Sequence, residues 1–357
     1  MATLREWLFP PKVEPPEDYG FFGPGSVAWK VWSYPTSLTV GFQRAVVIEE
    51  LDPALIAAVD KTSAIYARPR TRYDRTLRYF AMVLFGDSRS TAKAADVLVK
   101  VHSKAVGIDP VTGGRYDAND PRSQLWIHLT AWHSILLAYE KYGPGRLPED
   151  EENQFWEECA RAAELQTCDP ADIPRTREGV REYFDRMRPQ LIGSDIAKKA
   201  MRHLLKADVM LPPMPILFRP FFKIVAAFLR RATLATMPRW MREMGGLSTN
   251  RLLDLLIVPP MSATFTLFST SARLQLILLR FISPATVEVA APVLLKIPAA
   301  SPTTMTPREA QELYGYAIPA QAHHDLRDRQ RNRVLAEGLA PGDEGLLESE
   351  PILGRMA

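Results

Sequence analysis

The segment RYDRTLRYF, residues 72–80, opens the stretch that decides the fold of this chain. The stretch continues with FGD at 85–87 and HSKAVG at 102–107, and it ends with DPRSQLWIH at 120–128. Its apolar residues recur every three to four positions, which is the period of a helix buried along one side. We therefore expect three successive helices here, with several polar side chains at inward-facing positions.

Helix start signals extend this pattern to most of the chain. An Asp or Thr cap is followed by a good first helical residue at Asp52-Pro53, Asp87-Ser88, Asp120-Pro121 and Thr306-Pro307. The segment Leu38 to Leu51 also has a helical pattern, whereas alternation typical of strands does not recur. The sequence therefore predicts an all-α protein built around one large, bundle-like helical domain.

Composition shifts divide the chain. We expect an N-terminal arm at residues 1–25, a helical domain at 26–300 and a helical extension at 301–339. Residues 340–357 are acidic and rich in Gly and Pro, which predicts a disordered tail.

Charge and cysteine content exclude several classes of protein. The net charge is +3 in 357 residues, with 24% charged residues, so there is no electrostatic case for binding nucleic acid. Cys159 and Cys168 are the only cysteines, which argues against a disulfide scaffold, an iron–sulfur cluster and covalent c-type haem. Residues 1–16 lack a continuous apolar core, so we expect no secretory signal and a reducing, cytoplasmic location.

Two apolar segments bear on membrane contact. Leu255 to Ala272 is uncharged but is interrupted by Pro259-Pro260, which favours a buried helix–turn–helix over a membrane span. Phe218 to Leu229 has a basic edge at Arg230-Arg231, a pattern that fits peripheral contact with a membrane. Core packing is the more common explanation of such a pattern.

Two histidines have an inward disposition. His102 lies four residues after Leu98, and His128 lies three residues after Leu125, so both rings face the apolar side of their helices. A buried neutral imidazole can ligate a metal through one ring nitrogen. The alternative is a core histidine that is satisfied by a backbone carbonyl, which is the more common role of a lone inward histidine.

Four residues of the first helix share one face, because their spacing is i, i+3, i+4 and i+7; they are Arg72, Arg75, Thr76 and Tyr79. Two guanidinium groups beside a hydroxyl suit an anion, such as a haem propionate or a reduced oxygen species. A solvated face with carboxylate partners is the alternative. Neither a phosphate-binding loop nor the helical di-iron signature Glu-x-x-His occurs in the chain.

Taken together, these segments resemble the family of the latex clearing protein (rubber oxygenase) and the MpaB oxygenase of mycophenolic acid biosynthesis. The resemblance begins at GPGSVAW (23–29), is strongest across 72–128, and includes IPRT (173–176) and MPRW (237–240). It implies an all-helical fold that encloses haem b, globin-like in general character.

The resemblance also implies roles for single residues. His102 matches the axial ligand of the haem iron, and His128 would be a second-shell or alternative ligand. Arg72 and Thr76 match polar residues beside the haem, with Tyr79 on the same helix face. Arg75 stands where the rubber enzymes carry a lysine that can close the sixth coordination site; an arginine is a poor ligand because it stays protonated. Glu49 and Glu50 lie in the region of the family's glutamate base but out of register.

The function implied is that of a haem b-dependent mono- or dioxygenase, which would use dioxygen on a hydrophobic, isoprenoid or lipid-like substrate. The apolar residues between Leu211 and Leu295 would line a channel for that substrate. The rival interpretations are a haem-binding sensor or storage protein without turnover, and a structural helical protein whose inward histidines belong to the core.

Overall fold

The computed structural model describes residues 13–62, 64–206, 211–212, 215–342 and 345–354. These residues are mostly helical, so the prediction of an all-α protein is confirmed. The first part of the chain contains, in order, α2 (Val27–Trp32), the π-helix η1 (Ser37–Gly41), α3 (Phe42–Ile48), the 3-10 helix η2 (Glu49–Leu51), α4 (Pro53–Thr62), α5 (Ala64–Ala67), α6 (Pro69–Phe85), α7 (Ser88–His102), β1 (Val106–Ile108), β2 (Arg115–Asp117) and α8 (Pro121–Tyr142).

The remaining elements follow α8. The middle part contains α9 (Glu149–Ala163), η3 (Pro170–Asp172), α10 (Arg177–Met187), η4 (Arg188–Gln190), α11 (Asp195–Leu204), η5 (Ile216–Phe218), α12 (Arg219–Thr236), α13 (Arg239–Met244), α14 (Arg251–Leu256), α15 (Val258–Ser269), α16 (Ala272–Ile282) and α17 (Pro284–Leu294). The last part contains α18 (Pro307–Tyr314), α19 (Pro319–Arg331), the π-helix η6 (Asn332–Ala336) and α20 (Leu346–Leu353).

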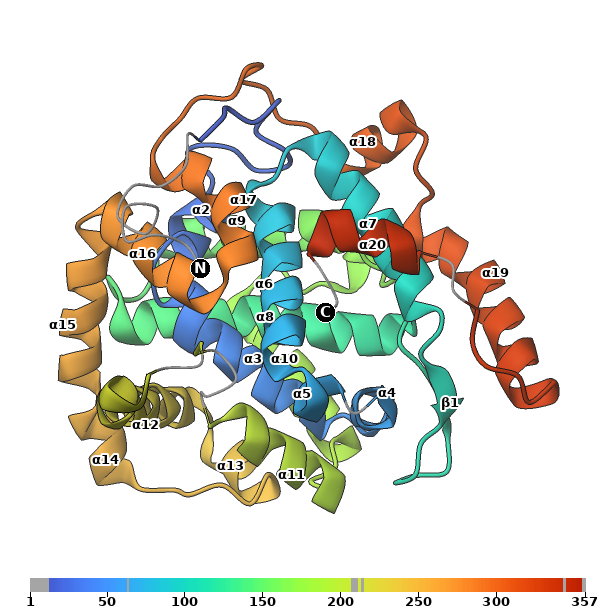
Figure 1. The fold of residues 1–357 in the computed structure, drawn as a ribbon, viewed down its shortest axis with the longest axis horizontal. Coiled ribbons are helices and arrows are strands. Elements are labelled where there is room, and N and C mark those ends of the chain that lie inside the picture. Colours follow the sequence, from blue (N-terminus) through green and yellow to red (C-terminus); the bar gives the residue numbers. More distant parts are fainter. Residues whose placement is uncertain (1–12, 63, 207–210, 213–214, 343–344, 355–357) are drawn as a thin grey trace.

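Helix α8 crosses the centre of the molecule, and the other helices surround it (Figure 1). It packs against α2, α3, η1, α9, α12 and α15. Helix α6 crosses in front of α8 and packs against α7, α17 and α20. Elements from all parts of the sequence therefore meet around α6 and α8.

The cap signals in the sequence explain where these helices begin. Asp87 accepts a hydrogen bond from the Ser90 backbone N–H at 2.8 Å, and Asp120 accepts from the N–H groups of the first turn of α8. Thr306 and Glu309 form the expected capping box at the start of α18. Each of these side chains satisfies backbone donors that have no partner within the helix.

An aromatic cluster fills the core between α2, α6, α8 and α9. Trp32 stacks on Phe80 with ring centroids 5.9 Å apart and meets the edge of Trp132 at 5.5 Å. Trp132 also lies 4.9 Å from Phe155. Each such pair adds about 0.5–1.5 kcal/mol to the stabilisation from burial.

Two local features differ from the sequence prediction. The expected single helix from Leu38 to Leu51 is divided into η1, α3 and η2. At the end of η1 the backbone passes so close to α8 that a Cβ on Gly41 would lie 3.1 Å from the Ile135 Cα. The antiparallel pair β1–β2 was not expected, because three-residue strands are too short to show alternation.

The end of the chain also differs from its prediction. Within residues 340–357, predicted to be disordered, the structure describes helix α20, with Leu353 and Ser349 buried against the rest of the protein. Two arginines of α6 hold it, as described below. The charged and glycine-rich composition gave no sign of these partners, because they lie far away in the sequence.

Candidate functional site

Three segments bring charged side chains together at one end of α6. Glu49 and Glu50 form the 3-10 turn η2, Arg72 lies in the first turns of α6, and His102 is the last residue of α7. The charge of Arg72 acts on both carboxyl groups and on the His102 ring. We call these four residues the Arg72 cluster.

Burial sets the protonation of this cluster. Burial raises the pKa of Glu49 to about 8, with a further increase from Glu50 and a decrease from Arg72. Burial also raises the pKa of Glu50 to about 7, against the effect of Arg72. For His102, burial and then the positive charge of Arg72 lower the pKa to about 4. At neutral pH the imidazole is therefore uncharged, and the two carboxyl groups titrate near that pH.

The side chains of the cluster make few direct polar contacts. Oε2 of Glu50 is buried without a hydrogen-bond partner, and among the described residues the Arg72 guanidinium donates no direct hydrogen bond. Nδ1 of His102 lies 3.5 Å from the Gln124 amide nitrogen, which donates to the Ala118 carbonyl at 2.5 Å. At that length the contact with Gln124 does not fix the tautomer of the His102 ring.

The other predicted histidine has a satisfied place in the core. His128 is 2% exposed, and its Nε2 lies 2.8 Å from the Cys159 carbonyl oxygen. It lies one helical turn after Gln124 on α8 and packs against the Trp132 ring at 5.9 Å. Burial lowers the pKa of His128 to about 4. This is the geometry of the core-histidine alternative.

The remaining predicted residues of α6 have local or distant partners. Arg75 points toward the end of the chain, where it donates to the Gly354 carbonyl and, at 3.0 Å, to the Ser349 hydroxyl. The Thr76 hydroxyl donates to the Arg72 carbonyl of its own helix at 2.9 Å. Tyr79 is buried beside Gln166, and burial raises the pKa of its hydroxyl. The structure therefore separates Arg72 from Arg75, which the sequence places on one face.

The coupling of Glu49 and Glu50 to Arg72 was not foreseen from the sequence. A signal does exist, since two adjacent carboxyl groups follow the apolar run from Ala45 to Ile48 and have no Lys or Arg within four residues after them. Their partner comes from α6 instead, a contact that helix periodicity does not specify.

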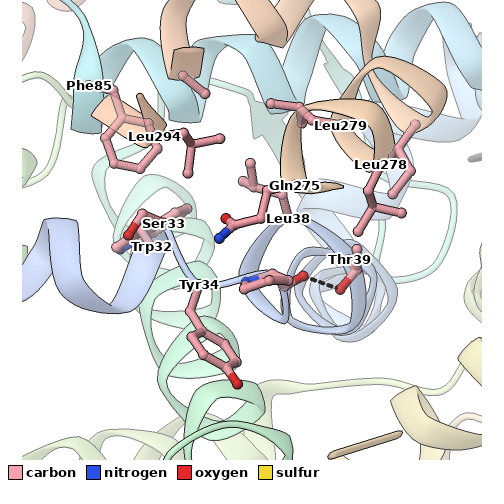
Figure 2. Close-up of a pocket in the computed structure, with 13 residues that line it drawn as sticks. Trp32, Ser33, Tyr34, Leu38, Thr39, Phe85, Gln275, Leu278, Leu279 and Leu294 are labelled. Carbon is pink, nitrogen blue, oxygen red and sulfur yellow. Dashed lines mark hydrogen bonds between the residues drawn. The ribbon is translucent and has the colours of Figure 1, made fainter. Parts of the chain in front are cut away.

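An apolar cleft lies elsewhere on the molecule (Figure 2). The cleft is shallow: its volume is about 390 Å³ when open solvent is included, and about 30 Å³ of it can hold the centre of a water molecule. Its walls come from α2, η1, the end of α6, α16 and α17. Phe85, in its wall, lies at the opposite end of α6 from Arg72, about 20 Å away at 1.5 Å per residue. The lining residues are Trp32, Ser33, Tyr34, Pro35, Leu38, Thr39, Phe85, Gln275, Leu278, Leu279, Ile282, Ala290 and Leu294.

Within the part of the chain that the structure describes, no group of three or more His, Cys, Asp or Glu side chains could hold a metal ion. The iron of a haem needs only one protein ligand, since the porphyrin supplies four. A single uncharged histidine such as His102 is therefore the relevant donor.

Comparison with known proteins identifies the family of this chain. No curated protein and no solved structure matches it. The family model described as "ER-bound oxygenase mpaB/B'/Rubber oxygenase, catalytic domain" matches residues 29–267, a range that contains the whole Arg72 cluster. The match covers more than half of the 357 residues, so this chain belongs to the MpaB and rubber oxygenase catalytic-domain family.

Proposed function

We propose that this protein is a haem b-dependent oxygenase that uses dioxygen on a hydrophobic substrate of isoprenoid or lipid-like chemistry. Membership of an oxygenase family supports the general reaction class. The observation that carries the proposal is the Arg72 cluster, in which an uncharged imidazole and two protonatable carboxyl groups lie within electrostatic range of the Arg72 guanidinium.

The donors present fit a haem. His102 keeps an unprotonated ring nitrogen at neutral pH because the pKa of the ring is lowered to about 4, and only that form can ligate iron. Arg72 supplies a cation suited to a propionate or to an oxygen species. The buried, unpartnered Oε2 of Glu50 is a further sign that the cluster has a ligand to meet, since buried polar atoms normally have partners.

Partial exposure leaves three residues of the Arg72 cluster accessible to a ligand. The side chains of Glu49, Arg72 and His102 remain partly exposed, although surrounding protein shifts the pKa of each. The apolar cleft in Figure 2 lies at the other end of α6, too far from the cluster to hold a substrate in contact with a haem bound there, so it is not part of the proposed reaction site.

Each residue has a task in this proposal. His102 would hold the iron, Arg72 would orient an anionic group, and Thr76 lies one turn after Arg72 on α6. Glu49 and Glu50 can hold or release a proton at neutral pH, because their pKa values are raised to about 8 and about 7. When bound, haem supplies the binding and activation of dioxygen.

Arg75, Tyr79 and His128 have structural roles in the proposal, since they contact the C-terminal helix, Gln166 and a backbone carbonyl respectively. Arg75 replaces the lysine of the rubber enzymes and is turned away from the cluster. A resting state closed by this side chain is therefore not part of the proposal, and neither is cleavage of polyisoprene.

The test combines a spectrum with a reaction. Protein from haem-supplemented cells should carry about one haem per chain, and it should consume dioxygen with an unsaturated isoprenoid hydrocarbon but not with its saturated analogue. Arg72→Ala should lower that consumption at least tenfold, whereas Lys93→Ala, a change at an exposed position of α7, should not. Haem without dioxygen consumption would point to a sensor or storage protein, and a colourless preparation would contradict the proposal altogether.

A further inference from the structure

The strongest feature outside the site is an exposed apolar surface on η5, α12 and α14. Leu217, Phe221, Ile224 and Phe228 follow the spacing i, i+4, i+7 and i+11, which places them along one face, and that face is in solvent. On the adjoining helix α14, the leucines on both sides of Asp254 are also exposed. The apolar face consists of Ile216, Leu217, Phe218, Phe221, Ile224, Phe228, Leu252, Leu253, Leu255 and Leu256, with exposures between 44% and 82%.

These helices form one corner of the molecule. Helices α12, α14 and α15 lie together at the lower left of Figure 1, and α14 packs against α12 and α15. Arg231 of α12 donates to the Asn250 carbonyl at 2.6 Å and pairs with Asp254 of α14, so the two helices are fixed relative to each other. The exposed side chains therefore stand on two helices that are fixed to each other, and not on a loose segment.

The charge of the segment that carries the apolar face is mostly positive. Residues 211–281 contain nine basic residues and only two acidic ones, Glu243 and Asp254. Asp254 forms ion pairs with Arg231 and Arg242, which neutralise its charge within the protein. The basic residues are Arg219, Lys223, Arg230, Arg231, Arg239, Arg242, Arg251, Arg273 and Arg280.

Helix α12 shows how apolar and basic residues are arranged. Arg219, Lys223 and Arg230 are exposed and spaced i, i+4 and i+11, so they share one face, which is turned by about 150° from the apolar stripe. A helix with an apolar stripe and with basic residues on its polar face is the form that lies in the interface plane of an anionic membrane. Soluble monomers rarely leave so many large apolar side chains together in water.

We propose that the apolar face is a docking site for an anionic lipid bilayer. Its leucines and phenylalanines would enter the boundary between headgroups and acyl chains, and its basic residues would contact anionic headgroups. Docking is independent of haem binding. The adjoining helix α16 contributes Leu278 and Leu279 to the apolar cleft, so a docked molecule would hold that cleft near the lipid phase.

The structure favours lying on the membrane over spanning it. By length and composition, residues Arg251–Ser269 could cross a bilayer. Only 17% of this stretch is buried inside the protein, so the prediction that this region is a buried helix–turn–helix is wrong. However, Met261 and Phe265 pack into the protein, with Phe265 6.4 Å from Tyr142. Withdrawing this stretch into a membrane would break those contacts and the Asp254 pairs.

Sedimentation with lipid vesicles tests the proposal. The full chain is mixed with vesicles of phosphatidylcholine alone or with phosphatidylglycerol added. We expect the chain to bind the anionic vesicles, and to bind the neutral vesicles about tenfold more weakly. Salt and carbonate should each release the bound protein. Phe221→Glu with Ile224→Glu should reduce binding at least tenfold, and Lys223→Glu with Arg230→Glu should reduce it about tenfold.

Matched variants keep this test decisive. Leu313→Glu introduces the same charge at an exposed leucine of α18, outside the apolar face, and should bind like the unaltered chain. The double variant Leu252→Glu, Leu256→Glu changes the part of the apolar face on α14 and should also reduce vesicle binding. It provides a second test if the α12 variant fails to fold. The proposal would be overturned by binding that survives the apolar double variants of both α12 and α14, or by absence of binding to either vesicle. Resistance to carbonate, or self-association through this face without vesicle binding, would also overturn it.

Discussion

At the scale of single residues, Glu50 links the geometry of the cluster to a measurable property. Its carboxyl group is 4% exposed, and its pKa is raised from 4.5 to about 7. Between these values the folded protein holds a proton that the unfolded chain has released, so stability falls as the pH rises through this window. Glu50→Gln removes the titrating group while keeping its size.

We therefore compare the free energy of unfolding of Glu50→Gln with that of the unaltered chain. As the pH rises from 5 to 8, this difference should shift in favour of the variant by about 1–3 kcal/mol. Urea unfolding at the two pH values measures this difference. Glu312→Gln, at an exposed position, should leave the pH dependence unchanged. An identical pH dependence for Glu50→Gln would show that this carboxyl group is not buried as described.

His128 should behave as a core residue. His128→Ala removes the partner of the Cys159 carbonyl and leaves a cavity beside Trp132, so we expect a loss of about 2–4 kcal/mol in the free energy of unfolding. Haem content per folded chain should stay unchanged. The exposed His324→Ala should cost less than about 0.5 kcal/mol. A stable His128→Ala protein without haem would reverse the roles of the two histidines.

The sequence predicts some of these residue positions but not their partners. Spacing alone predicts that His102 and His128 both face inward, but it cannot tell that a carbonyl from α9 satisfies one of them. It also places Arg72 and Arg75 on one face, whereas three positions along a helix turn a side chain by about 60°. That difference lets Arg72 meet Glu50 while Arg75 meets the end of the chain.

At the scale of elements, α20 depends on two arginines of α6. Arg75 contacts Ser349 and Gly354, and Arg78 donates to the Ile352 carbonyl at 2.8 Å. The double variant Arg75→Ala, Arg78→Ala should therefore free α20, and amide hydrogen exchange across residues 346–353 should become at least about tenfold faster. Arg181→Ala, which removes an exposed pair with Glu178, is the control. Unchanged exchange in α20 would show that its apolar contacts suffice.

Helix starts were the most predictable elements, because a cap and a proline act within one turn of each other. The starts of α4, α7, α8 and α18 were confirmed for this reason. The division of residues 37–51 and the order of α20 were not predictable, since both depend on contacts with distant helices. Local signals fix where a helix begins, and tertiary packing decides how it bends and what covers it.

At the scale of the whole molecule, the fold gathers η2, α6 and the end of α7 into one charged cluster inside an all-helical protein. The family match, over residues 29–267, places the residues of this cluster within a catalytic domain of the MpaB and rubber oxygenase family. It does not identify the residue that holds the cofactor. The central claim is that His102 does so, and its uncharged state at neutral pH is the property on which the claim depends.

An absorption spectrum with a haem-to-protein ratio, measured on His102→Ala and on the unaltered chain, tests this claim most directly. Both proteins are purified from haem-supplemented cells and compared at equal helix content, with His324→Ala as the control. We expect a strong Soret band for the unaltered chain and for His324→Ala. The His102→Ala protein should have lost most of its bound haem. An undiminished Soret band with full haem content in His102→Ala would contradict this claim.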